Sequence, residues 1–125
     1  MTVVIDTSAL VAFVKKEPGG EQVGPRLAEG VVSPVILAET LSKLASQGFD
    51  ARSIRDRLFT AGLTVEPFGP DDVQAVVALN TLARSSISLA DRFCLALAMQ
   101  RGLPVLTGDR PWADLGLPLR IEFIR

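Results

Sequence analysis

Short, largely apolar runs separated by helical patterning constrain the fold of this chain more than any other feature. Most of these runs are too continuous to leave one face in water, and the last alternates apolar and charged residues. Strands of this kind that alternate with helices form a parallel sheet covered on both faces. We therefore predict an α/β fold, a three-layer sandwich with a central, mainly parallel sheet. Its expected strands are residues 2–5, 31–32, 63–66, 104–106 and 119–123.

Capping and stop signals indicate where the helices begin and end. Ser33 followed by Pro34 is typical of a helix start, and Asp50 is a typical cap. Glycines at positions 48, 62 and 102 are typical stops. The predicted helices cover residues 9–14, 34–47, 50–61, 70–84 and 88–101, and a weaker helix over residues 21–29 is interrupted by Gly24 and Pro25. With 125 residues, the chain has the usual size of one domain, and we expect a single domain over residues 1–125.

Four acidic residues stand among apolar neighbours, where carboxylates are rare without a partner: Asp6, Glu39, Asp91 and Asp109. In parallel sheets the carboxyl ends of the strands and the helix N-termini share one edge. Three of the four acids are predicted at that edge, because two follow strands and one lies in the first turn of a helix. Two charges about 4 Å apart cost roughly 4 kcal/mol at a dielectric near 20. Converging acids therefore take up protons or hold a cation, for which Mg²⁺ or Mn²⁺ is suited.

Each acid also has an ordinary structural interpretation. Asp6 can be a strand-end residue or a helix cap, and Glu39 can pair with Lys43 one turn later. Asp91 has the form of a capping box with the serine three residues before it. Asp109 can cap the short turn that follows it. The prediction of a metal site therefore depends on convergence of the four acids.

Composition excludes several chemistries. The chain has no histidine and no tyrosine, which excludes Ser-His-Asp and Cys-His catalysis and histidine-ligated zinc. Thirteen basic against fourteen acidic residues give a net charge of −1, so any polynucleotide binding depends on local arginines and lysines. The single cysteine, Cys94, lies in an apolar run typical of a buried side chain. Without a secretory signal or a membrane-length segment, we expect a cytoplasmic protein.

Four pieces of the chain share their order and spacing with a known family: residues 4–10, Glu39, residues 88–98 and residues 105–112. Together they resemble the PIN-domain ribonucleases, and among them the VapC-type toxins of toxin–antitoxin pairs. The resemblance covers essentially the whole chain. It implies a catalytic quartet that holds one or two Mg²⁺ or Mn²⁺ ions, made of Asp6, Glu39, Asp91 and Asp109.

The resemblance also implies an activity, the hydrolysis of RNA phosphodiesters by metal-activated water. Ser8 and Thr107 resemble the polar residues that support the acids in this family. Arg92 and Arg110 each adjoin a proposed ligand and are candidates for phosphate contacts, with solvated surface charge as the alternative. Trp112, after the last acid, is expected to pack rather than to catalyse.

The partners implied by the resemblance are an RNA substrate, a second copy in a homodimer and a cognate antitoxin. The antitoxin is expected to lie in an apolar groove and to reach the acids with a basic side chain. A hydrophobic fraction of 48% leaves apolar groups for such an interface. Large apolar residues near the first helices serve either that groove or the core: Leu10, Phe13, Val14, Phe49, Leu58 and Phe59.

Other functions remain alternatives. A haloacid-dehalogenase pattern requires a second acid two residues after the first, where this chain has Ser8, and a receiver domain requires a late lysine, whereas none follows Lys43. A PIN nuclease that is not a toxin, or a PIN-like RNA-binding module without efficient cleavage, remains compatible with the sequence.

Overall fold

The fold is built on a five-stranded sheet in which every neighbouring pair of strands is parallel, in the order β3-β2-β1-β4-β5. The computed structural model describes the backbone of residues 1–125 and the side chains of residues 1–82 and 86–125. The strands are β1 (Val3–Ile5), β2 (Gly30–Val32), β3 (Thr64–Val65), β4 (Val105–Thr107) and β5 (Ile121–Phe123). The predicted α/β architecture is confirmed, and the sheet is wholly rather than mainly parallel.

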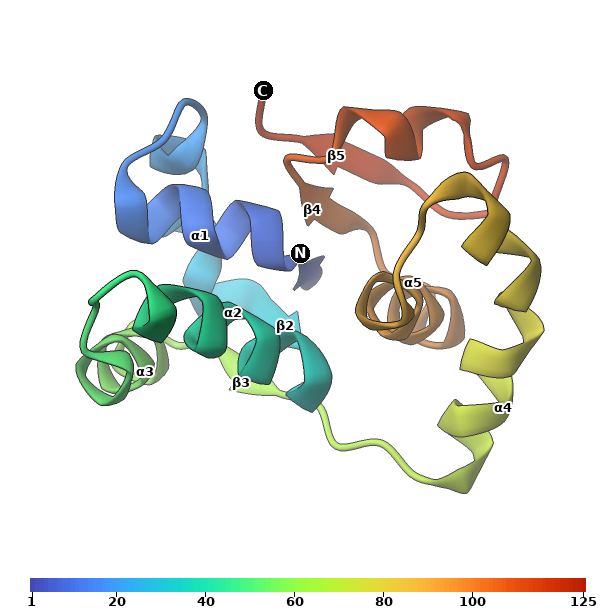
Figure 1. The fold of residues 1–125 in the computed structure, drawn as a ribbon, viewed down its shortest axis with the longest axis horizontal. Helices are drawn as coiled ribbons and strands as arrows, with labels where there is room; N and C mark the ends of the chain where they lie inside the picture. Colours follow the sequence, from blue (N-terminus) through green and yellow to red (C-terminus); the bar gives the residue numbers. More distant parts are fainter.

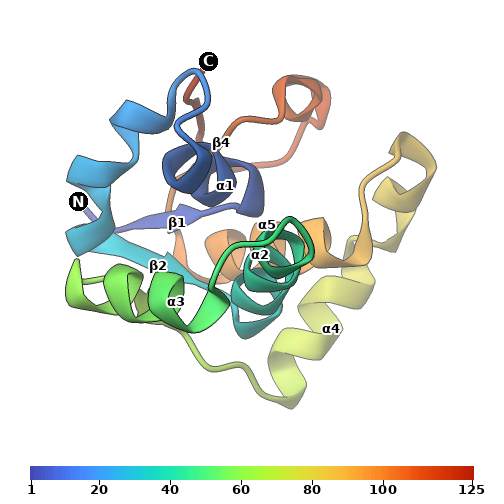
Figure 2. The ribbon, with the colours of Figure 1, turned by 60° about the vertical axis from the view of Figure 1, so that its left-hand side comes forward.

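Helices cover both faces of this sheet, and α1 and α5 lie on opposite sides of it (Figure 1). The second view shows the same layers from the side (Figure 2). α2 packs against both α1 and α5 and so joins the two layers near the strand ends. The α-helices are α1 (Thr7–Lys15), α2 (Pro34–Ser46), α3 (Ala51–Thr60), α4 (Pro70–Ala78) and α5 (Leu89–Arg101).

Two predicted helices differ from the structure. Residues 21–29 form two 3-10 turns, η1 (Gly20–Gln22) and η2 (Gly24–Glu29), because Pro25 lacks the N–H that a continuous helix needs there. The helix predicted over residues 70–84 ends at Ala78, where the N–H of Leu79 donates to the carbonyl of Val76, three residues earlier. The 3-10 turn η3 (Asn80–Ser85) follows. The end predicted near residue 84 falls among residues whose side chains lie outside the description.

The caps on the other helices are those expected. The Ser33 hydroxyl accepts the N–H of Val35 at 3.1 Å, and the Asp50 carboxylate accepts that of Ser53 at 3.2 Å. These side chains satisfy helix-end donors that would otherwise lack partners. Both caps fix the points at which the chain enters the helices that border the sites described below.

The core lies around the central strand, because all three residues of β1 are fully buried. Cys94 is also fully buried, as expected, and Trp112 packs into the core from η4 (Arg110–Asp114). Within the part of the chain that the structure describes, no helix has the length and apolar character needed to cross a membrane.

Candidate functional site

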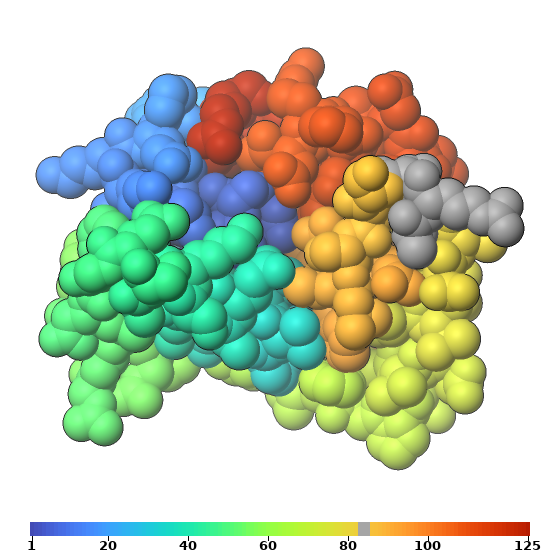
Figure 3. All heavy atoms as spheres, viewed as in Figure 1, coloured from blue at the N-terminus to red at the C-terminus, as the bar shows by residue number. Residues whose placement is uncertain are grey.

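All four predicted acids line one pocket of about 610 Å³ at the carboxyl edge of the sheet. Asp6 directly follows β1, Asp109 follows β4, and Asp91 lies in the first turn of α5. Glu39, which the family resemblance and not the pattern of strands and helices assigns to the same site, reaches it from α2. The space-filling view shows the hollow, with the N-terminal helix at its base and α2, the start of α5 and the C-terminal residues around it (Figure 3).

The sheet topology explains this meeting point. β1 is the central strand, with β2 on one side and β4 on the other, so the chain leaves β1 and β4 in opposite directions. Such a switch point opens a crevice at the carboxyl ends of the strands. Across it, the Thr40 hydroxyl of α2 donates to that of Thr7 in α1 at 3.3 Å, beside Asp6. This contact helps bring α2, and with it Glu39, to the crevice.

Asp6 is the most constrained acid of the pocket. Its side chain is only 1% exposed, and its Oδ2 accepts hydrogen bonds from Ser8 Oγ at 2.8 Å and Thr107 Oγ1 at 2.9 Å. Those hydroxyls in turn accept the backbone N–H groups of Gly108 and Asp109, at 2.8 and 3.0 Å. The other carboxylate oxygen, Oδ1, is buried and has no hydrogen-bond partner among the residues whose side chains the structure describes. The hydroxyls thus fix the carboxylate and leave one oxygen for a ligand.

The pKa of Asp6 is raised from 3.8 to about 6, chiefly by burial and to a smaller extent by the charges of Asp91 and Asp109, while the hydrogen bonds from Ser8 and Thr107 lower it. Burial also raises the pKa of Asp109, as does the charge of Asp91, and Lys43 lowers it. Near neutral pH, ionisation of these acids in the pocket is therefore energetically unfavourable. A bound cation would offset that cost.

The ordinary interpretations hold for some acids and not for others. Asp6 and Asp109 occupy N-cap positions, but neither side chain makes a capping hydrogen bond. Glu39 and Lys43, both among the described residues, form no ion pair within 4.0 Å and instead line the same pocket. Capping and pairing therefore do not account for these three acids.

Asp91 has both roles. Its Oδ2 accepts the backbone N–H of Ser88 at 3.0 Å, and the Ser88 hydroxyl accepts the N–H of Asp91 at 3.1 Å, which is a complete capping box. The same carboxylate borders the pocket. One oxygen is thus used by the helix end, and the other remains for the pocket.

The donor set fits a hard divalent cation. The four predicted carboxylates of the pocket supply oxygen ligands, and Asp6 Oδ1, without a hydrogen-bond partner among the described residues, is a buried acceptor that a cation would satisfy. Among the side chains the structure describes, however, no three acids or cysteines close around one point as a ready-made metal cluster. Mg²⁺ usually keeps several waters and takes only one or two carboxylates directly. The pocket therefore suits an ion held partly through water.

The two arginines predicted to contact phosphate lie outside this pocket. Arg92 donates to Asn80 Oδ1 at 3.0 Å, and the Arg110 guanidinium lies 4.8 Å from the centre of the Phe123 ring. The basic residues that do line the pocket are Lys15, Lys43 and Arg125. The sequence carried one signal for the last of these, since Arg125 follows the carboxyl end of a predicted strand.

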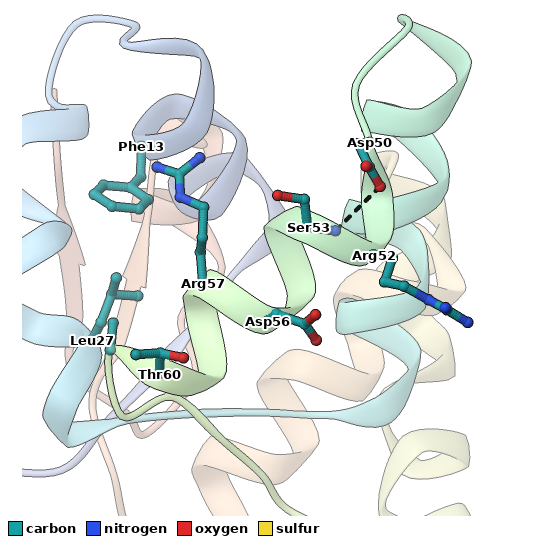
Figure 4. A pocket seen from close by; sticks show the side chains of 9 residues that line it. Phe13, Leu27, Asp50, Arg52, Ser53, Asp56, Arg57 and Thr60 are labelled. Carbon is teal, nitrogen blue, oxygen red and sulfur yellow. Dashed lines mark hydrogen bonds between the residues drawn. The ribbon is translucent and has the colours of Figure 1, made fainter.

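A second pocket of about 680 Å³ lies between α1, η2 and α3. Phe13 and Leu27 form its apolar part, and the Arg57 side chain extends toward Phe13 (Figure 4). Leu10 and Leu58 are buried in the core, whereas Phe49 and Phe59 are partly exposed outside this lining. Of the six apolar residues considered for a partner groove, Phe13 alone lines this pocket.

Comparisons with known proteins agree with the architecture. The family model of the PIN domain matches residues 3–116. A search of curated proteins by sequence finds no match. Among solved structures, a chain of a toxin–antitoxin complex from Klebsiella pneumoniae has a TM-score of 0.74 at 16% identity, over 99% of this chain and 98% of that one.

Two further structures are similar to the same degree. VapC20 of Mycobacterium tuberculosis, a toxin that cleaves the sarcin–ricin loop, has a TM-score of 0.74 at 17% identity, over 95% of this chain and 99% of that one. A DNA-bound VapBC of Salmonella typhimurium has a TM-score of 0.73 at 19% identity, over 100% of this chain and 99% of that one. At these identities the likeness concerns the fold.

Proposed function

The chain belongs to the PIN domain family, and from that premise we propose that it is a Mg²⁺- or Mn²⁺-dependent endoribonuclease and the toxin of a toxin–antitoxin pair. The observation that carries the proposal is the meeting of Asp6, Glu39, Asp91 and Asp109 around one pocket. Asp6 Oδ1, a buried acceptor without a hydrogen-bond partner among the described residues, is the oxygen best placed to bind a cation.

Each group of residues has a distinct part in this proposal. Asp6, Asp91 and Asp109 would hold the ion, with Glu39 as a ligand of the ion or of its water. When bound, the ion supplies an activated water and stabilises charge on the phosphate and the leaving oxygen. Ser8 and Thr107 orient the Asp6 carboxylate through its Oδ2. Arg92 and Arg110, with their side chains engaged elsewhere, are the weaker candidates for contacts to distant phosphates.

A cleavage assay tests the proposal. We expect the purified protein to cleave structured RNA with Mn²⁺ and not with EDTA, and Asp109→Asn to lose most of this activity. Asp114→Asn is the matched control, because Asp114 is an exposed acid in η4 that does not line the pocket. Lack of metal-dependent cleavage by the unsubstituted protein would contradict the nuclease proposal, as would equal activity of Asp109→Asn.

A second candidate is an RNA-binding module without efficient cleavage. The observation in its favour is that the described acids and cysteines form no ready-made metal cluster and that Asp91 is partly used by its capping box. RNA binding by the unsubstituted protein without cleavage in Mn²⁺ would favour this second function. Cleavage that depends on the acids would exclude it.

The partner that we propose is an antitoxin whose segment lies in the pocket between α1 and α3 (Figure 4). Phe13 offers an apolar contact there, and the exposed Arg57 offers a charge. Val11 and Lys15 of α1 line the acid pocket, so a segment that crosses α1 can reach the four acids with a basic side chain.

Growth experiments test the toxin and its antitoxin together. We expect expression to arrest growth and the product of the neighbouring gene to relieve the arrest. Arg57→Glu should remain toxic but lose that relief, whereas Arg120→Glu, at the other edge of the sheet, should keep it. Expression without growth arrest would instead indicate a PIN nuclease that is not a toxin. A homodimer is also part of the proposal, and sedimentation of the purified protein tests it.

A further inference from the structure

Basic side chains border the acid pocket alongside the four proposed ligands. Lys15 and Lys43 reach it from α1 and α2, and Arg125 reaches it after β5. Arg125 differs from the two lysines because the structure holds it in place from several sides. It is therefore the basic side chain whose position in the pocket is best defined.

The guanidinium of Arg125 is fixed at one of its nitrogens. Nη1 donates to the carbonyl oxygen of Pro18 at 3.0 Å and lies 3.7 Å from Oε1 of Glu17. Gly108 lies close to the same guanidinium. A Cβ added at Gly108 would lie 3.1 Å from Nη2 and 3.2 Å from Cζ of Arg125. A side chain at position 108 would require the guanidinium to shift by a few tenths of an ångström, so the guanidinium packs closely on the loop that carries Asp109.

The backbone before Arg125 is equally well held. The Gln22 amide donates to the carbonyl oxygen of Ile124 at 3.2 Å. Gly19 approaches the same carbonyl so closely that a Cβ would collide with it, and the φ of Gly19 is +87°, a conformation that favours glycine. The N–H of Ile124 donates to the Thr107 carbonyl at 3.0 Å. The segment is thus tied both to the loop before η1 and to β4.

The charge of Arg125 lowers the pKa of Asp109, but two features distinguish Arg125 from a simple counterion of the acids. It forms no ion pair within 4.0 Å with any of the four acids, all of which lie among the described residues. Among the described residues, Nη1 is also the only one of its guanidinium nitrogens with a hydrogen-bond partner. With 36% of the side chain exposed, Nε and Nη2 remain for a ligand from solution. A phosphate accepts such a pair of parallel donors.

We propose that Arg125 binds an RNA phosphate next to the one hydrolysed at the four acids, and so positions the strand in the pocket. This inference rests on the proposed nuclease function. The ion and its carboxylates would serve the reacting phosphate, and Arg125 would bind its neighbour on the Glu17 side of the pocket. Lys43, which lines the same pocket from α2, would offer this strand a second positive charge.

Cleavage kinetics with a short single-stranded RNA and Mn²⁺ test the role of Arg125. Because a hydrogen bond to a charged group is lost, Arg125→Ala should raise KM about tenfold with kcat nearly unchanged. The salt dependence of kcat/KM should become shallower by about 0.7 of a log unit per log unit of salt, the value for one phosphate contact on a single strand. Arg125→Lys should recover part of the lost affinity, because it keeps the charge without the paired donors.

Arg120→Ala is the matched control, since Arg120 lies on the same C-terminal segment, with a side chain that is 73% exposed, but does not line the acid pocket. It should leave KM and the salt dependence unchanged. Binding of fluorescein-labelled RNA in EDTA, followed by anisotropy, provides a readout independent of activity. Arg125→Ala should weaken it about as much as it raises KM.

Failure of the inference and failure of the nuclease proposal are distinguishable. If the unsubstituted protein cleaves RNA and Arg125→Ala has the same KM and the same salt dependence, the role of Arg125 is overturned and the nuclease stands. A fall in kcat or in melting temperature at unchanged KM also overturns the role of Arg125, because that pattern indicates that Arg125 only stabilises the fold. If the unsubstituted protein neither cleaves nor binds RNA, both are overturned.

Discussion

The two edges of the same sheet carry opposite kinds of surface. At the carboxyl edge, the acid pocket is lined by eight charged side chains, including that of the almost fully buried Asp6. At the amino edge, a pocket of about 340 Å³ is lined by residues such as Met99, Leu103 and Pro104, with Arg120 as its one charged side chain. Strands of two or three residues separate the two edges. The charge of the carboxyl edge is thus a local feature of that edge.

The difference shows where the fold contains an energetically unfavourable buried group. Among the described residues, no buried side-chain nitrogen or oxygen at the amino edge lacks a hydrogen-bond partner, whereas at the carboxyl edge one oxygen of the buried Asp6 carboxylate does. Unsatisfied buried groups and perturbed pKa values are concentrated at functional sites. The predictions that follow test this contrast, beginning with the largest effect.

The largest effect is expected from removing the charge of Asp6. Asp6→Asn should reduce RNA cleavage and Mn²⁺ affinity by more than about a hundredfold. Loss of a residue that only supports a metal ligand already lowers metal affinity or activity about ten- to a hundredfold, and Asp6 is proposed as a ligand itself. Leu119→Ala at the amino edge should leave both within about twofold. Cleavage rates and calorimetric Mn²⁺ titration measure the two effects. Similar losses in both variants would erase the contrast between the edges.

The next effect concerns stability against pH. Because the pKa of Asp6 is about 6 in the folded protein and 3.8 as its ordinary value, the folded state binds the proton more tightly. In EDTA the free energy of unfolding should therefore fall as pH rises from about 4 to about 6, by up to about 3 kcal/mol. The raised pKa of Asp109 acts in the same direction.

Urea unfolding at several pH values measures this dependence, and Asp6→Asn provides the comparison. The variant should lose most of the slope and should be more stable than the unsubstituted protein near neutral pH without metal. A stability that instead rises between about pH 4 and about pH 6 would contradict the assignment of Asp6 as a costly buried acid.

A smaller effect separates the two roles of Asp91. Asn at this position keeps an oxygen that can accept the N–H of Ser88, so Asp91→Asn should change stability little while reducing Mn²⁺ affinity. Ser88→Ala should do the opposite, with a loss of about 1 kcal/mol of stability and nearly normal Mn²⁺ affinity. Melting curves and calorimetry distinguish them. If both variants lose stability equally and neither loses Mn²⁺ affinity, Asp91 is a cap alone.

The smallest effect is expected for the hydroxyl that holds Asp6. Thr107→Val removes a 2.9 Å hydrogen bond to Asp6 Oδ2 that lowers its pKa, so the acidic limb of the pH–rate profile should move to higher pH. The cost in stability should be about 1 kcal/mol. Thr64→Val is the control, because the Thr64 hydroxyl donates to the Gly30 carbonyl at 3.3 Å and Thr64 does not line the acid pocket. A profile that moves equally in both variants would show that Thr107 does not tune Asp6.

Much of the fold and part of the site follow from the sequence. The parallel sheet follows from apolar runs between capped helices, and its carboxyl edge follows from Asp6 and Asp109, each placed just after a strand. Glu39 required more, since its position depends on the packing of α2 against α1 and α5. That packing involves contacts between residues far apart in the chain, such as the Thr40–Thr7 hydrogen bond.

The basic side chains were the part that sequence reasoning missed. Arg92 and Arg110 adjoin acids in the sequence, but neighbours in a helical turn point in different directions. Arg125 lies at the pocket because Gly19 leaves room for the backbone of its segment, and its guanidinium packs closely against Gly108. Such close approaches leave no periodic signal in the sequence. The dual role of Asp91 was equally hidden, because a capping box is the same motif whether or not it borders a pocket.

The most direct test of the account is an anomalous scattering map from crystals soaked in Mn²⁺. We predict a peak in the acid pocket at about 2.1 Å from Asp6 Oδ1, the coordination distance typical of Mg²⁺. Asp91 and Asp109 should lie within direct or water-mediated reach, and the peak should be absent from Asp6→Asn crystals. A map without a peak in this pocket, or with the ion bound elsewhere, would contradict the central claim that these acids form one metal site.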